Sequence, residues 1–159
     1  MFEKRIEKRE CWLGERVTYQ DLHRKSKLQE SYNAAQLRGV MAEWGYLDAS
    51  VINGDSHGAD LLFYRYRDAH VLKVQLKGRP ALGKGYIGKN LHIAYPDRKN
   101  NCWYIYPHDE MMAACLQAQP PASKKCWHQT KSWVQKGGYS WPSAPRWMRD
   151  ILSPYRVQK

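Results

Sequence analysis

The feature that most restricts the fold is a pair of apolar segments joined by a short polar turn. Residues 59–66 and 71–77 are rich in Leu, Val, Phe and Tyr, and residues 67–70 (Arg-Asp-Ala-His) interrupt them. Two such runs around a polar break predict a β-hairpin. Successive side chains of a strand point to opposite faces, so a turn centred near 67–68 places Asp60 opposite or diagonal to Gln75.

A helix is expected before this hairpin and further strands after it. From Glu30 to Trp44, apolar or small residues recur at helical spacing, and Gly45 is a natural stop. Strands are expected at 91–95 and 102–106, and the segment after Pro107 predicts a helix with acidic residues in its first turn.

The length of 159 residues favours a single domain. We divide it into a charged, helical N-terminal segment (1–29), a core (30–117) and a basic, aromatic C-terminal extension (118–159). Seven tryptophans in so small a domain more often fill a core than contact a ligand, and only one or two need be exposed.

The balance of charge indicates an anionic partner. The chain has 26 Lys and Arg against 15 Asp and Glu, a net charge of +11. Nucleic acid, acidic lipid and acidic protein all fit this charge. No apolar run approaches the roughly 20 residues that cross a bilayer, and the N-terminal residues lack the apolar core of a secretory signal. We therefore expect an intracellular, cytoplasmic protein without a membrane partner.

The four cysteines are scattered and form no CxxC pair, which predicts reduced thiols and neither a disulfide framework nor a zinc ribbon. Cys115, Cys126 and His128 are a conceivable metal site, but their spacing fits no standard zinc pattern. Small buried or half-buried side chains are the preferred interpretation.

The predicted hairpin brings together residues suited to phosphodiester chemistry. Opposed residues on paired strands have Cβ atoms about 4.5–5.5 Å apart, so the Asp60 carboxylate and the Gln75 carbonyl can reach one divalent ion. Lys77 is the next residue on that face and can orient or help to deprotonate a water. A slip of one residue in the register would separate these side chains.

Asp60 and the triplet Gln75-Leu76-Lys77 resemble the motif of the PD-(D/E)xK nuclease superfamily, in which an acidic residue at the start of a hairpin precedes an (Asp/Glu/Gln)-x-Lys triplet. Glu30 and Gly45 stand where that family often has a helix glutamate and the following glycine. The resemblance implies a restriction-endonuclease-like α/β (α+β) fold, a central mixed β-sheet flanked by helices. It also implies Mg²⁺-dependent cleavage of double-stranded DNA, with Mn²⁺ as a substitute.

On this resemblance Asp60 and Gln75 bind Mg²⁺, Lys77 lies near the attacking water, and Glu30 assists from the helix. Glutamine replaces the commoner acid and lowers the negative charge offered to the metal. Cutting two strands calls for two sites, so a homodimer or higher homo-oligomer is expected. Restriction, intron homing and junction or repair cleavage remain open.

Other roles for the same residues are also open. Asp60 follows a turn-forming segment where aspartate commonly bonds the backbone, Lys77 could be a surface charge, and Glu30 could act only on the helix dipole. Asp55 and His57 are alternates near Asp60. The whole chain could be a non-catalytic DNA-binding module with a nuclease-like fold, or an adaptor for an acidic protein.

DNA contacts are expected from a Gly-rich segment and from the C-terminal region. Residues 82–89 lack the spacing of a Walker A loop, which favours either a flexible basic loop near the scissile phosphate or a solvated connection. After residue 123, Lys and Arg alternate with Trp and Tyr, a mixture that can neutralise phosphates and stack on bases. The predicted DNA-binding residues are Arg79, Lys84, Lys89, Lys124, Lys125, Lys131, Lys136, Arg146 and Arg149.

Overall fold

The computed structural model describes residue 20 and residues 26–50, 58–118 and 126–158. Most of the N-terminal segment 1–29 lies outside these ranges, as do Asp55, His57, Lys124 and Lys125. Within the described residues no helix is long and apolar enough to cross a membrane.

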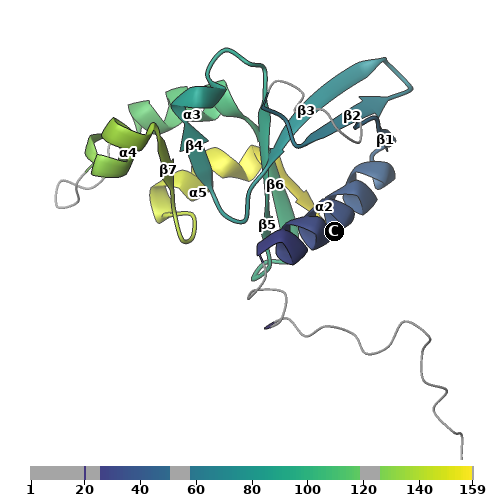
Figure 1. Cartoon of the computed structure of the whole chain (residues 1–159), viewed down its shortest axis with the longest axis horizontal. Helices are drawn as coiled ribbons and strands as arrows, with labels where there is room; N and C mark the ends of the chain where they lie inside the picture. Colours follow the sequence, from purple (N-terminus) through teal and green to yellow (C-terminus); the bar gives the residue numbers. More distant parts are fainter. Residues whose placement is uncertain (1–19, 21–25, 51–57, 119–125, 159) are drawn as a thin grey trace, which may run out of the picture.

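The main element is a curled mixed sheet of six strands, in the order β1-β2-β3-β5-β6-β8 (Figure 1). The β3–β5 pair is parallel, and all other neighbours in this sheet are antiparallel. A second sheet has two antiparallel strands, β4 and β7. The bounds are β1 Tyr46–Asp48, β2 Leu61–Arg65, β3 His70–Leu76, β4 Ala81–Gly83, β5 His92–Asp97, β6 Cys102–Pro107, β7 Gly138–Ser140 and β8 Arg156–Gln158.

The helices gather at two ends of this sheet. The long helix α2 lies beside β1, whereas α3, α4 and α5 lie together at the other end of the molecule (Figure 1). The helices are α2 (Ser26–Glu43), α3 (His108–Gln117), α4 (Lys131–Lys136) and α5 (Arg146–Leu152), with 3₁₀ turns η1 (Lys84–Tyr86), η2 (Trp127–Gln129) and η3 (Ser153–Tyr155). The expected combination of a mixed β-sheet with helices is therefore confirmed.

Helix α2 covers one face of the hairpin. It begins at Ser26, about one turn before the predicted start, and the chain leaves it at Gly45, whose φ of 77° is easily adopted only by glycine. Leu37, Val40 and Met41 of α2 share an apolar core with the buried side chains Leu61, Phe63, Leu72, Val74 and Leu76 of β2 and β3. The alternation of side chains then turns Gln75 toward the opposite face of the sheet.

A second core holds most of the aromatic side chains. Trp127, Trp133 and Trp141 are buried against β5, β6, α3 and α5, and Trp103 is buried in the first core. Trp44 has 59 % of its surface exposed. The prediction that most tryptophans fill space is confirmed for the described part of the chain.

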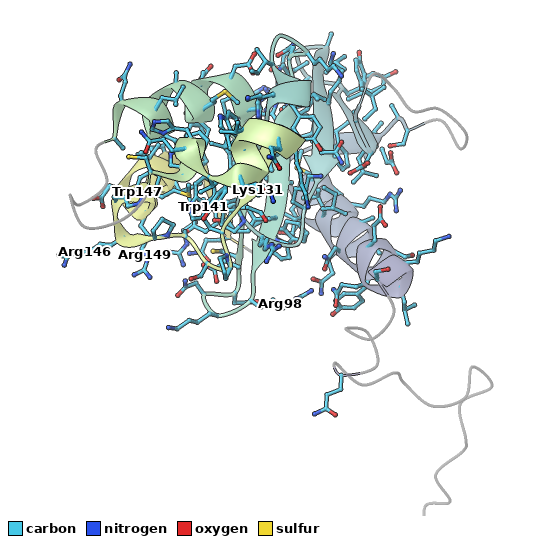
Figure 2. The ribbon with its side chains drawn as sticks, turned by 60° about the vertical axis from the view of Figure 1, so that its left-hand side comes forward. Arg98, Lys131, Trp141, Arg146, Trp147 and Arg149 are labelled. Atoms are coloured by element: carbon cyan, nitrogen blue, oxygen red, sulfur yellow. The ribbon has the colours of Figure 1, made fainter. Side chains whose placement is uncertain are left out.

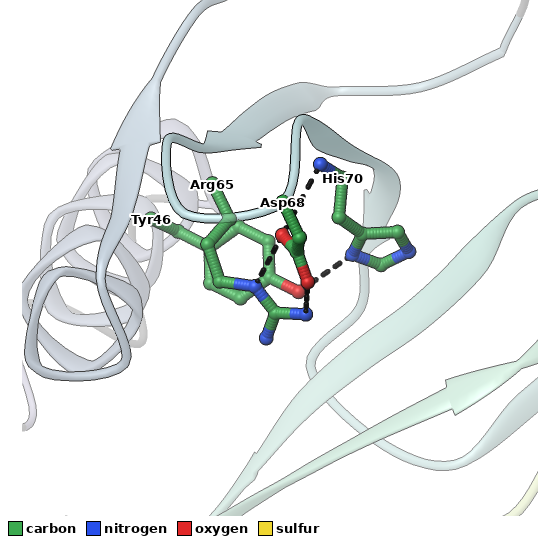
Figure 3. A network of polar contacts seen from close by, with 4 residues as sticks. All are labelled: Tyr46, Arg65, Asp68 and His70. Atoms are coloured by element: carbon green, nitrogen blue, oxygen red, sulfur yellow. Dashed lines mark hydrogen bonds and ion pairs between the residues drawn. The ribbon is translucent and has the colours of Figure 1, made fainter.

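A polar network closes the β2–β3 hairpin in the predicted register (Figure 3). Arg65 donates to both carboxylate oxygens of Asp68, from Nε at 2.9 Å and Nη2 at 2.6 Å, and the His70 amide donates to the same carboxylate. The Tyr46 hydroxyl bonds His70 Nδ1 at 2.7 Å and ties β1 to the turn. Hydrogen bonding from Arg65 lowers the pKa of Asp68 to about 2.

Candidate functional site

Asp60 and Gln75 lie directly opposite each other at the open end of the hairpin. The pairing of Leu61 with Val74 continues one residue further, because the Asp60 amide donates to the Val74 carbonyl at 2.9 Å. Asp60 Oδ2 accepts two hydrogen bonds, from Gln75 Nε2 at 2.5 Å and from the Leu76 amide at 2.7 Å. The carboxylate is exposed and the amide half-buried. The structure therefore brings together the first two predicted site residues.

Lys77 follows β3 and extends its pairing with β5. Its amide donates to the Ala94 carbonyl at 2.8 Å, which fixes the backbone beside the Asp60–Gln75 pair. The Lys77 ammonium lies 5.3 Å from the centroid of the Tyr86 ring, a distance at which the face of the ring attracts a cation. Lys77 is therefore close to Gln75 in the sequence, and its ammonium is positioned by the Tyr86 ring.

Tyr86 belongs to a loop that is anchored by a buried histidine. The side chain of His108 has 0 % exposure, and its Nε2 accepts from the Gly83 amide at 3.1 Å. Because Nε2 is an acceptor, the proton is on Nδ1, which donates to Asp109 at 2.8 Å. The rings of Tyr86 and His108 meet edge to face with centroids 5.5 Å apart.

The other end of this loop is held by Asp109, the partner of His108. The Gly88 amide donates to the second oxygen of Asp109 at 2.9 Å, and hydrogen bonding from His108 and then Gly88 lowers the pKa of that carboxyl. One His–Asp pair therefore fixes both ends of the loop that carries Tyr86. The adjacency of a histidine and an aspartate at a helix start was the signal available in the sequence, and it indicated only the helix.

The same loop also reaches the outer face of the hairpin. Lys73 Nζ donates to the Lys89 carbonyl at 2.7 Å. The Lys89 ammonium lies beside Gly58, since a methyl group placed on that glycine would come within 3.8 Å of Nζ. Lys89 is thus close to the segment that leads into Asp60.

Glu30 is not joined to this group by any contact among the described residues. It lies beyond the first turn of α2, which has no acidic residue, and its side chain is exposed. The buried face of α2 packs on the sheet face opposite to the one that carries Gln75. The helix therefore positions its glutamate apart from the pair.

The metal-binding capacity of the pair is modest. In the described residues no three His, Cys, Asp or Glu side chains converge on one point, and this includes Cys115, Cys126 and His128. Asp60 Oδ1 makes no hydrogen bond within the described ranges, and Gln75 can offer Oε1 if its amide turns over. Mg²⁺ keeps several waters and needs only one or two carboxylates, so one carboxylate and one amide oxygen fit a weakly held ion.

Two adjoining clefts collect cationic side chains beside Lys77. The first, which we call the central cleft, has a volume of about 880 Å³ and is lined by the cations Lys77, Arg79, Arg98 and Lys136. The second, the distal cleft, has about 520 Å³ and is lined by Arg79, Arg98, Lys99 and Arg149. Arg79 and Arg98 line both. The lining residues include a single carboxylate, Asp97 in the distal cleft.

The predicted DNA-binding residues divide between these clefts and the surface outside them. Arg79, Lys136 and Arg149 line a cleft, whereas Lys131 and Arg146 are exposed at the starts of α4 and α5 and line neither. Figure 2 shows Arg149 and Arg146 projecting from α5, and Arg98 from the turn between β5 and β6.

The remaining predicted contacts lie in or near the loop after β4. Lys84 is exposed, with its ammonium 5.3 Å from the centroid of the Trp133 ring.

Arg98 and Lys99 line the clefts but were not predicted, because the sequence around them indicates only a polar turn. Two adjacent cations in that turn were the available signal.

No family model matches this chain, and no curated protein or solved structure matches it either. Its functional assignment therefore depends on Asp60, Gln75 and Lys77 and on the two basic clefts.

Proposed function

We propose that the chain is a Mg²⁺-dependent endonuclease that hydrolyses phosphodiester bonds of double-stranded DNA, with a restriction-endonuclease-like core of the PD-(D/E)xK type. The observation that carries the proposal is the direct opposition of Asp60 and Gln75 across β2 and β3, with Lys77 two residues further on. A mixed sheet with this hairpin inside it also agrees with the resemblance. Such an enzyme would work inside the cell, at the nucleoid.

Asp60, Gln75 and Lys77 would each have a separate role in the reaction. A bound Mg²⁺ would lower the pKa of a water and offset the charge that develops on phosphorus. The Leu76 amide fixes Asp60 Oδ2, so Oδ1 is the oxygen that faces a ligand. Gln75 contributes its carbonyl oxygen after its amide turns. Lys77 donates from its ammonium to a phosphate oxygen or to the attacking water.

The substrate class follows from the charge beside Lys77. Four cations line the central cleft that Lys77 enters, with no carboxylate among its lining residues. Such a surface attracts phosphates and releases their counterions, which makes binding strongly dependent on salt. Cleavage of both strands of a duplex calls for two copies of this site, so we propose that the active form is a homodimer or a larger homo-oligomer.

A second candidate function is a non-catalytic DNA-binding module with the same fold. Two observations favour it. Gln75 donates a hydrogen bond from its amide nitrogen to the Asp60 carboxylate at 2.5 Å, and Asp60 is the single carboxylate of the pair. This arrangement can be a purely structural hydrogen bond that needs no metal ion. The basic clefts would then hold DNA without cutting it.

A nicking assay on supercoiled plasmid separates the two candidates. With Mg²⁺ or Mn²⁺ the wild type is expected to yield nicked and linear DNA, and EDTA is expected to stop the reaction. Asp60→Asn and Lys77→Ala are each expected to lower the rate by about 10²-fold or more. Lys27→Ala, which removes an exposed lysine of α2 that lines neither cleft, is the matched control and is expected to keep its rate.

The possible failures have distinct meanings. A wild type that binds plasmid but does not nick it with either metal would leave the binding module as the function. A filter-binding titration at two salt concentrations tests the charge-based part of the proposal independently. Affinity that does not fall with salt would exclude both DNA functions and favour an acidic protein partner.

A further inference from the structure

We propose that the distal cleft binds an unpaired nucleotide, so that the preferred substrate is duplex DNA with a single-stranded extension next to the cleavage site. The inference rests on the proposed function and specifies its substrate. It depends on three properties of the distal cleft: its cations, its aromatic wall and its connection to Lys77.

The cations are arranged to hold phosphate groups. Arg79, Arg98, Lys99 and Arg149 line the distal cleft. The carboxylate of Asp97 is engaged by Asn100, which donates from its amide at 3.2 Å and from Nδ2 at 2.7 Å. Arg149 donates from Nε to the Ala144 carbonyl at 3.2 Å, which orients its guanidinium at the cleft. The local charge is therefore strongly positive.

The wall of the cleft offers an aromatic platform. Tyr104 and Tyr95 both line it, and their rings are stacked with centroids 5.3 Å apart and planes 24° apart. Tyr104 is half-buried and lines the cleft, so a ligand in the cleft can contact it. Bases stack on such rings with little dependence on sequence, but only after they have left a duplex.

Tyr95 adds a polar group beneath this platform. Only 4 % of its surface is exposed, and its buried hydroxyl has no hydrogen-bond partner among the described residues. Burial raises the pKa of Tyr95, so the hydroxyl keeps its proton and remains a donor. A buried donor without a partner is costly, and a small shift of the wall would let a base or sugar oxygen accept from it.

The dimensions and the position of the cleft favour one strand over two. A volume of about 520 Å³ lies in the range of small-ligand pockets and suits one or two nucleotides, whereas an intact duplex is far wider. Arg79 and Arg98 continue from the distal cleft into the central cleft, which Lys77 also lines. The shared cations therefore join the distal cleft to Lys77, which follows Gln75 by two residues in the chain.

The test is a fluorescence anisotropy titration of the whole chain in EDTA, where binding is measured without cleavage. Four DNAs are compared: a blunt duplex, the same duplex with 5′ overhangs of four nucleotides, the same duplex with 3′ overhangs of four nucleotides, and the free single strand. We expect the wild type to bind one overhang duplex about tenfold more tightly than the blunt duplex. Asp60→Asn is expected to keep this preference.

Two pairs of variants locate the preference in the cleft. Arg149→Ala is expected to lose most of it, whereas Arg67→Ala, which removes an exposed arginine from the turn between β2 and β3 outside both clefts, is expected to keep it. Tyr104→Leu is expected to lose it and Tyr104→Phe, which retains a stacking ring, to keep it. Circular dichroism checks that each variant is folded. If Tyr104→Leu does not fold, Arg149→Ala, which changes only a surface residue, still tests the inference.

The outcomes distinguish a failure of the distal-cleft inference from a failure of the proposed nuclease function. Equal affinity of the wild type for blunt and overhang duplexes would overturn the inference, as would equal losses in Arg149→Ala and Arg67→Ala. Plasmid cleavage combined with no overhang preference would reject the distal cleft alone. An overhang preference without cleavage in Mg²⁺ or Mn²⁺ would reject the hydrolytic function and retain the nucleotide site.

Discussion

The substitution Gln75→Glu tests whether the Asp60–Gln75 pair is a metal site. It replaces the donor that bonds Asp60 Oδ2 at 2.5 Å with a second carboxylate in the same place. Without a metal ion, two negative charges then face each other across β2 and β3. With Mg²⁺, the same two carboxylates make a stronger site than the wild-type pair, because each contributes a full negative charge.

The size of the effect follows from the exposure of the pair. Two charges about 4 Å apart repel by about 1 kcal/mol in water and about 4 kcal/mol near a protein surface of low polarity. Asp60 is exposed, so the repulsion together with the lost hydrogen bond is expected to cost about 2 kcal/mol. For a chain of this size, that lowers the Tm by about 4–8 °C.

Mg²⁺ is expected to reverse this loss. An ion present at about 100 times its Kd adds about 2.7 kcal/mol to the free energy of unfolding, enough to restore the wild-type Tm. The measurement is thermal unfolding in EDTA and in a Mg²⁺ series. The double variant Asp60→Asn, Gln75→Glu is the control, because it keeps one carboxylate opposite one amide. A Tm of Gln75→Glu that Mg²⁺ raises no more than that of the control would refute the metal site.

Three further predictions concern other parts of the fold. His108→Phe leaves the Gly83 amide without an acceptor and is expected to lower the free energy of unfolding by about 1–3 kcal/mol in urea titrations, whereas an unchanged midpoint would contradict the anchoring role. The Arg65–Asp68 pair holds the pKa of Asp68 at about 2, below its unfolded value of about 3.9. Its stabilisation is therefore present above pH 4 and lost as the pH falls toward 2. The Tm difference between wild type and Asp68→Asn should disappear over that interval, and a difference that persists at pH 2 would argue against it. Burial raises the pKa of the Cys115 thiol to about 12, so iodoacetamide at pH 8 should label it only after unfolding; rapid labelling of Cys115 in the native chain, read by mass spectrometry of its peptide, would contradict its burial.

The hairpin was predictable because its sequence carries both of the signals that set a register. The alternation of Leu72, Val74 and Leu76 fixes which face is buried, and the polar turn fixes the pairing. Together they place Asp60 opposite or diagonal to Gln75, and the structure has the two residues directly opposite each other. The role of this pair is a separate matter that the alternation does not address.

The start of α2 was predicted one turn late for a physical reason. The apolar periodicity begins only after Asn33, a buried polar residue on the inner face of the helix. Asn33 is satisfied there by Gln29 at 2.9 Å and by Arg98 at 3.0 Å. A partner that is 65 residues away in the chain leaves no local pattern.

The clefts could not be predicted, since they arise from contacts between distant segments. Arg79 and Lys136 meet in the central cleft because β4 pairs with β7, and each of these strands has three residues. Three residues are too few to show alternation, and the Gly-rich sequence around β4 indicates a loop. The composition predicts a basic surface, but the position of the central cleft on that surface depends on the pairing of β4 with β7.

The pairing of β4 with β7 also has a consequence for synthesis on the ribosome. Besides its strand partners, β4 is flanked by hydrogen bonds from Trp141 to the Pro80 carbonyl and from Lys84 to the Gly137 carbonyl. A nascent chain grows by about 5–20 residues per second, so β4 waits several seconds for a partner about 60 residues downstream. During that interval its edge is unprotected, and a chaperone that shields the segment after Leu76 should raise the yield of native protein.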